Sequence, residues 1–168
     1  MEAETTIFLN VPEPHGECVQ LNCFVDADQA ENEISQQSQK GVLLFVCNAP
    51  NIRYSKQQNI AETFTFGSVY IAANTATEMI KSFLYYFCIL GIPIDGPRNM
   101  CFESEGVVRN STMPESTLKE KHVASCYHCV QDAFAFGMIQ IVKEDEAKNI
   151  VDILTKSLPG SQLREVIG

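Results

Sequence analysis

The chain has 168 residues and an apolar fraction of 45%, which is typical of one globular domain and excludes a disordered tail. Its formal net charge of −9 argues against tight autonomous binding to nucleic acid, because proteins that bind phosphates normally present a basic surface. We find no signal peptide and no apolar stretch long enough to span a bilayer, so we expect an intracellular protein of the cytoplasm or nucleus.

After an irregular lead-in at residues 1–19, the sequence shows three strand patterns in succession, and helix and strand patterns alternate from there on. A hairpin turn is expected at 48–51, where Asn and Pro interrupt two strand patterns. The order predicts an α/β domain over 20–160, with a mixed sheet that is antiparallel in its first part, and a tail over 161–168. In chain order, the predicted elements are strands over 20–26, 42–47 and 52–57, a helix over 66–90, a strand over 98–102, a helix over 118–136, a strand over 138–142 and a helix over 144–158.

The seven cysteines do not predict a disulfide framework, because their number is odd and their spacing irregular. Cys126 and Cys129 form a C-x-x-C pair close to His122 and His128. A zinc site needs four converging ligands, and the sequence has no second pair of this kind. Thiols on a helix are the favoured interpretation, and a cysteine-based metal or redox protein stays as an alternative.

Several short motifs occur in a fixed order along most of the chain. They are FVDAD at 24–28, YSKQQ at 54–58, FGSVYIAA at 66–73, GIPIDGP at 91–97 and VDILTKSLP at 151–159. Together they resemble the ribonuclease H domain of copia-type retrotransposon Pol polyproteins, whose last motif is close to ADILTKPLP. The resemblance implies a ribonuclease H-like fold, with a five-stranded mixed sheet and helices on both faces.

The same resemblance implies a site of four acidic residues that hold two divalent ions, Mg²⁺ or Mn²⁺, and cleave RNA in RNA–DNA hybrids. Three of the four positions map to Asp26, Glu103 and Asp152, which we interpret as remnant catalytic and metal-binding carboxylates. Glu103 stands where the family has aspartate. The fourth position, a glutamate in the family, falls at Val69, which has no oxygen to offer a cation. Ion binding is therefore expected to be weak or absent.

The leading prediction is a degenerate retrotransposon ribonuclease H-like domain, ancestrally acting on RNA–DNA hybrids, with weak or no activity and weak autonomous binding to nucleic acid. Two alternatives stay open. One is an active, divergent hybrid ribonuclease that uses the three remaining acids and favours Mn²⁺. The other is a non-enzymatic module that binds an unknown protein partner.

Overall fold

The computed structural model describes residues 16–28, 38–58, 65–113, 123–145 and 150–155. A five-stranded mixed sheet forms its centre, in the spatial order β3-β2-β1-β4-β5. The first three strands pair antiparallel, whereas β4 and β5 continue the sheet in parallel with β1. The strands are β1 (Leu21–Asp28), β2 (Gln39–Val46), β3 (Ala49–Gln57), β4 (Arg98–Phe102) and β5 (Ile139–Lys143).

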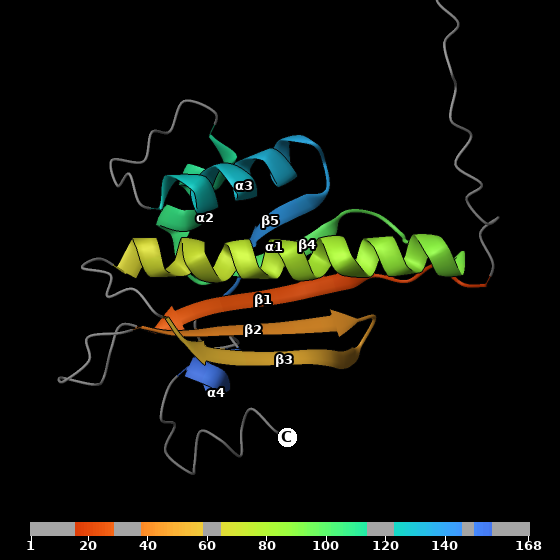
Figure 1. Cartoon of the computed structure of the whole chain (residues 1–168), viewed down its shortest axis with the longest axis horizontal. Helices are drawn as coiled ribbons and strands as arrows, with labels where there is room; N and C mark the ends of the chain where they lie inside the picture. Colours follow the sequence, from red (N-terminus) through yellow and green to blue (C-terminus); the bar gives the residue numbers. More distant parts are fainter. Residues whose placement is uncertain (1–15, 29–37, 59–64, 114–122, 146–149, 156–168) are drawn as a thin grey trace, which may run out of the picture.

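The helices lie on both faces of this sheet. Helix α1 runs along one face with α2 and α3 beside it, while the short α4 lies on the opposite side near β3 (Figure 1). The predicted fold, a mixed five-stranded sheet with helices on both faces, is confirmed. The helices are α1 (Thr65–Leu90), α2 (Glu105–Thr112), α3 (Ala124–Ala135) and α4 (Asp152–Thr155).

The core fills the space between the sheet and α1. Alternate residues of β1 are buried there, because successive side chains of a strand point to opposite faces. Helix α1 buries one face against them, with the three-then-four spacing that predicted it. The two sets are Leu21, Cys23, Val25 and Ala27 from β1, and Val69, Ala73, Ala76 and Ile80 from α1. Asp26, which alternates with the β1 set, therefore points to the face opposite α1.

The hairpin between β2 and β3 is tighter than expected. Only Cys47 and Asn48 form the turn, and Ala49 and Pro50 already pair within β3, so the predicted turn at 48–51 was placed too late. Cys47 adopts a left-handed backbone with φ of 55°, which a two-residue hairpin turn requires.

Helix α2 was not predicted. Its sequence, EGVVRNST, is poor in strong helix formers, so local propensity does not reveal it. Tertiary contacts compensate, since Val107 is fully buried and the Ser111 hydroxyl lies 2.8 Å from the Tyr70 hydroxyl.

The other boundary differences concern the two later helices. The helix predicted over 118–136 begins at Ala124 in the described part, and 118–122 lie outside it. The helix predicted over 144–158 was placed too early, because 144–145 are not helical and α4 begins at Asp152. Residues 1–15 of the lead-in and the tail at 161–168 also lie outside the described residues. Among the described helices, none combines the length and the apolar character needed to cross a membrane.

Candidate functional site

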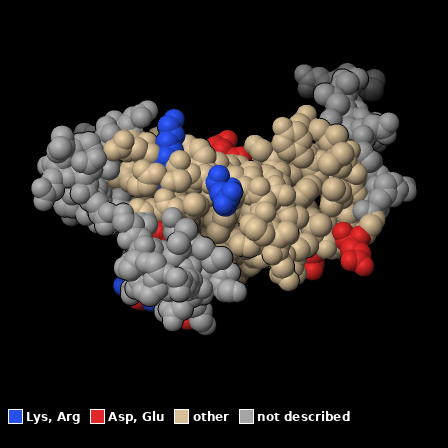
Figure 2. Space-filling model, turned by 90° about the horizontal axis from the view of Figure 1, so that it is seen from below, with Lys and Arg blue, Asp and Glu red and all other residues tan. Residues whose placement is uncertain are grey.

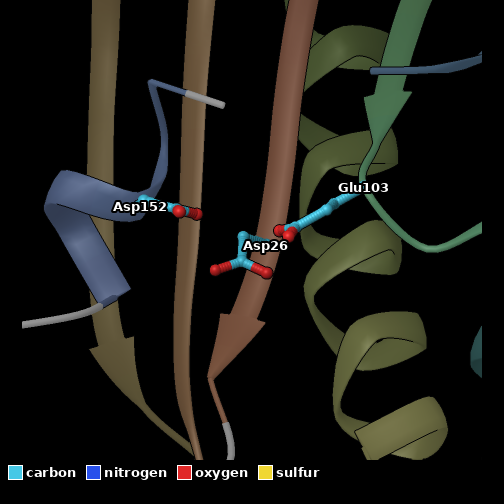
Figure 3. Close-up of side chains that lie close together, drawn as sticks. All are labelled: Asp26, Glu103 and Asp152. Atoms are coloured by element: carbon cyan, nitrogen blue, oxygen red, sulfur yellow. The ribbon is translucent and has the colours of Figure 1, made fainter. Parts of the chain in front are cut away.

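Three carboxylate side chains from distant parts of the chain meet beside the sheet. Asp26 lies on β1, Glu103 directly follows β4, and Asp152 is the first residue of α4. One ligand oxygen of each lies within 4.8 Å of the others. Figure 3 shows the three side chains directed toward one another. The structure thus brings together the three acids to which the sequence assigned a common site.

The sheet explains why Asp26 and Glu103 lie side by side. Strands β1 and β4 are parallel neighbours in which Val25 is level with Phe102, so the next residue of each chain segment is also level. Val25 and Phe102 both point into the core. The following residues, Asp26 and Glu103, therefore leave the sheet on the opposite face.

Helix α4 brings the third carboxylate to the same face by packing directly on β2. The two elements approach closely at Gly41, which pairs with Asp26 across β1 and β2. A Cβ atom built on Gly41 would lie 2.7 Å from Thr155 Cγ2 and 3.3 Å from Leu154 Cβ. The Ser55 hydroxyl of β3 also donates a hydrogen bond of 2.7 Å to the Leu154 carbonyl oxygen. A side chain at position 41 would hold α4 away from the sheet.

Asp26 is the most enclosed of the three acids. The residue is 9% exposed, whereas Glu103 and Asp152 are half-buried. The Thr155 hydroxyl donates a hydrogen bond of 2.6 Å to Asp26 Oδ2, which ties the end of α4 to β1. Ionised carboxylates at this separation repel one another, and a cation between them removes that repulsion. Three hard oxygen donors suit Mg²⁺, Mn²⁺ or Ca²⁺ better than a soft transition metal.

Val69 offers no ligand to this group. It lies on the core face of α1, is 7% exposed and packs in the same cluster as Ala73 and Ala76. In the part of the chain that the structure describes, no fourth acid joins the three carboxylates. Glu78, further along α1, is exposed and accepts a hydrogen bond of 2.8 Å from Lys81 Nζ. Glu62, the other acid considered as a replacement, lies outside the described residues.

The cysteine motif does not assemble a metal site among the described residues. Cys126 and Cys129 lie on α3 and are half-buried, and His128 beside them is exposed. Lys81 Nζ lies 3.7 Å from Cys129 Sγ. His122 lies outside the described residues. The contacts of this pair fit the interpretation as thiols on a helix.

Sequence reasoning missed the residues that hold the site together. Gly41, Ser55 and Thr155 carry no chemistry that would single them out in a sequence. A weak signal existed at Gly41, because glycine within a strand often marks the close approach of another segment. The contact of Thr155 with Asp26 joins residues 129 positions apart, so no local pattern predicts it.

Solved structures with the same arrangement identify the fold. A ribonuclease H1 isolated from compost, crystallised in complex with an RNA/DNA hybrid, superposes with a TM-score of 0.62 at 18% identity, covering 86% of this chain and 99% of that one. This chain has the ribonuclease H fold. The ribonuclease H1 of the archaeon Halobacterium salinarum matches with a TM-score of 0.60 at 12% identity, over 87% of this chain and 98% of that one.

Sequence comparison adds the relationship to mobile elements. The chain is 27% identical over 147 residues to the retrovirus-related Pol polyprotein from transposon RE1 of Arabidopsis thaliana, and 26% identical over 149 residues to that from transposon RE2. Each match covers 85% of this chain and 10% of the polyprotein, so the chain spans about a tenth of the length of these relatives. No protein-family model matches. The predicted resemblance to retrotransposon Pol polyproteins is confirmed.

Proposed function

We propose that this ribonuclease H-like domain is a degenerate retrotransposon hybrid ribonuclease, which holds one divalent cation weakly and hydrolyses RNA–DNA hybrids weakly or not at all. The observation that carries the proposal is the convergence of three carboxylates, Asp26, Glu103 and Asp152, while Val69, at the position where the resemblance implies a fourth, packs in the hydrophobic core. The site has three of the four carboxylates that the resemblance implies and lacks the fourth.

The donor set fits a single hard cation. Asp26, Glu103 and Asp152 each offer an oxygen within 4.8 Å of the other two, which is close enough for one ion to contact all three. A bound divalent ion would supply Lewis-acid stabilisation of negative charge at the phosphate. The chain's own part is to bind and orient that ion, with Asp26 as the enclosed ligand and Glu103 and Asp152 on the solvent side.

The same donor set is too small for paired ions. Two cations held close together require several carboxylates to offset their repulsion, and three acids leave the second ion short of ligands. Val69, at the position where the resemblance implies glutamate, cannot supply the missing oxygen. Glu103 further departs from the family's aspartate by one methylene, which alters the reach of its oxygens. Both departures support weak or absent two-metal hydrolysis.

Charge also supports weak binding of a nucleic acid. The chain carries 21 Asp and Glu against 12 Lys and Arg. Among the described residues visible from the side that carries α4, the Lys and Arg side chains lie apart and form no cluster (Figure 2). Since counterion release by clustered basic residues dominates affinity for phosphates, we infer that the isolated domain binds a hybrid poorly.

A hydrolysis assay on an RNA–DNA hybrid, paired with Mn²⁺ titration calorimetry, tests this function. We expect about one weakly bound Mn²⁺ per chain, lost in Asp26→Asn, and cleavage close to background in Mg²⁺ and in Mn²⁺. Robust cleavage that Asp26→Asn abolishes would overturn the proposal. If that cleavage required Mn²⁺, it would support instead an active, divergent nuclease with three acids.

A protein-binding role is the second candidate, and the far end of α1 favours it. Tyr85, Tyr86, Ile89 and Leu90 are between 51% and 65% exposed. Exposed apolar patches of this kind often mark contact surfaces for other proteins. Light scattering tests the simplest case, association between copies of this chain. Association that depends on concentration and is reversed by Tyr86→Ser would support it, and a monomer at every concentration counts against it.

A further inference from the structure

We propose that Thr155 is a positioning residue for the cation site, whose hydroxyl group fixes the carboxylate of Asp26 and seats α4 so that Asp152 faces the same ion. The inference rests on the proposed function, because the site is the carboxylate group described above. It adds a residue that holds no ion and contacts a residue that does.

The first observation is the hydrogen bond itself. Thr155 Oγ1 lies 2.6 Å from Asp26 Oδ2, within the range of charge-assisted O–H···O⁻ bonds, which are stronger than neutral ones. Asp26 is 9% exposed, so water competes little for this oxygen. A hydrogen bond to one carboxylate oxygen limits rotation of the group and leaves the second oxygen outside this bond. Such partners of metal ligands commonly raise affinity by orienting the ligand.

The second observation is that α4 cannot hold its own position. Its described residues, Asp152–Thr155, make about one turn, and a single turn is not stable as an isolated helix in water. Its position therefore depends on tertiary contacts. Ser55 donates a hydrogen bond to the Leu154 carbonyl oxygen, and Gln39 Nε2 in turn donates one of 2.6 Å to Ser55 Oγ. These two bonds hold the backbone of α4 over β3, and Thr155 adds the connection to β1.

Both branches of the Thr155 side chain are in use. Its methyl group packs over Gly41, where a Cβ atom would approach Cγ2 to 2.7 Å, while its hydroxyl reaches Asp26. This division separates two roles by substitution. Thr155→Val keeps the shape and the packing but removes the hydrogen bond. Thr155→Ser keeps the hydroxyl and removes the methyl contact.

Mn²⁺ titration calorimetry on the full chain tests the inference, at a temperature at which circular dichroism shows every variant folded. We expect Thr155→Val to weaken Mn²⁺ binding by about tenfold, as loss of a hydrogen-bond partner of a metal ligand typically does. Thr155→Ser should stay within about twofold of the unmodified chain. The matched control is Thr112→Val on α2, which removes a hydroxyl bonded to the Val108 carbonyl oxygen and should leave binding unchanged. Equal binding by the Val variant, or equal loss in both Thr155 variants, would overturn the inference.

A second measurement without metal separates this inference from the proposed function. Absence of Mn²⁺ binding by the unmodified chain would overturn the proposed function. The seating of α4 is then judged by hydrogen exchange of the Leu154 amide, which donates to the Val151 carbonyl oxygen at 2.8 Å. Faster exchange in Thr155→Val than in Thr155→Ser is expected. Equal exchange in the two variants would show that the hydroxyl does not hold the helix.

Discussion

The three carboxylates are positioned by two different means, and the difference tells which part of the site tolerates change. Asp26 and Glu103 depend on the paired backbones of β1 and β4, whose register places them level with each other. Asp152 depends on the packing of α4 over Gly41 and on side-chain hydrogen bonds that join α4 to β1 and β3. A strand pair is held by several main-chain bonds that most substitutions leave intact, whereas the seat of α4 depends on single side chains.

The largest expected effect comes from Val69→Glu, which restores on α1 the glutamate that the resemblance to the retrotransposon family implies at this position. We expect a second Mn²⁺ to bind and cleavage of an RNA–DNA hybrid to rise by about a hundredfold, in line with the effect of one charged or dipolar group on a transition state. Calorimetry and the hybrid assay measure both. Without a cation the buried carboxylate should destabilise the fold, so Mn²⁺ should raise the melting temperature more in this variant than in the unmodified chain.

Val69→Gln is the matched control for Val69→Glu, because glutamine has nearly the same shape as glutamate and carries no charge. If the Glu and Gln variants bind Mn²⁺ and cleave alike, Val69 does not occupy the place of a missing ligand. The proposal that the site is inactive because it lacks a ligand at this position would then lose its main support.

Gly41→Ala should have the next largest effect, through the position of α4. The added Cβ would lie 2.7 Å from Thr155 Cγ2 and 3.2 Å from Val151 Cγ2, so α4 must shift. We expect about tenfold weaker Mn²⁺ binding and a loss of about 1–3 kcal/mol in the free energy of unfolding, typical of overpacking. Calorimetry and urea unfolding measure these.

Gly106→Ala provides the comparison for that substitution. Gly106 is exposed within α2, where alanine should stabilise the helix by up to about 1 kcal/mol. Unchanged Mn²⁺ binding in Gly41→Ala would mean that α4 adapts without moving Asp152. The position of Asp152 would then tolerate substitution nearly as well as the positions of Asp26 and Glu103 on the paired strands.

The smallest expected effect is a change of folding stability with pH, which comes from a buried thiol on β4, the strand that precedes Glu103. Burial raises the pKa of the Cys101 thiol on β4 to about 11, with a further contribution from the nearby Glu144 carboxylate. The unfolded chain, with a thiol pKa near 9.0, loses this proton first as the pH rises. Stability from this group is therefore fully present below pH 9 and lost between about pH 9 and 11.

Urea unfolding at pH 8, 9 and 10 measures this loss, which should be on the order of 1 kcal/mol per buried thiol. Burial also raises the pKa of the Cys23 thiol on β1, so part of the slope should remain in Cys101→Ala. If Cys101→Ala leaves the pH dependence of the free energy of unfolding unchanged, the group that titrates is not Cys101.

Much of the fold was accessible from local patterns. The strand ranges, the extent of α1 and the antiparallel start of the sheet follow from apolar periodicity and from Gly and Pro at element ends. Helix α2 was not accessible, because its residues have low helix propensity and Val107 and Ser111 are stabilised by contacts with the core and with Tyr70. The two-residue turn depends on the left-handed conformation of Cys47. Cysteine is not a residue type from which such a turn can be predicted.

The amino-acid order alone established which acids to consider, because Asp26, Glu103 and Asp152 occur within recognisable motifs and alternation along a strand assigns Asp26 to one face. It also established that the Val69 side chain carries no oxygen, which no conformation can change. The separation of the carboxylates and the roles of Gly41, Ser55 and Thr155 emerged only once the chain was folded. Their contacts join segments more than ninety residues apart, and such distances depend on packing that no short window of sequence contains.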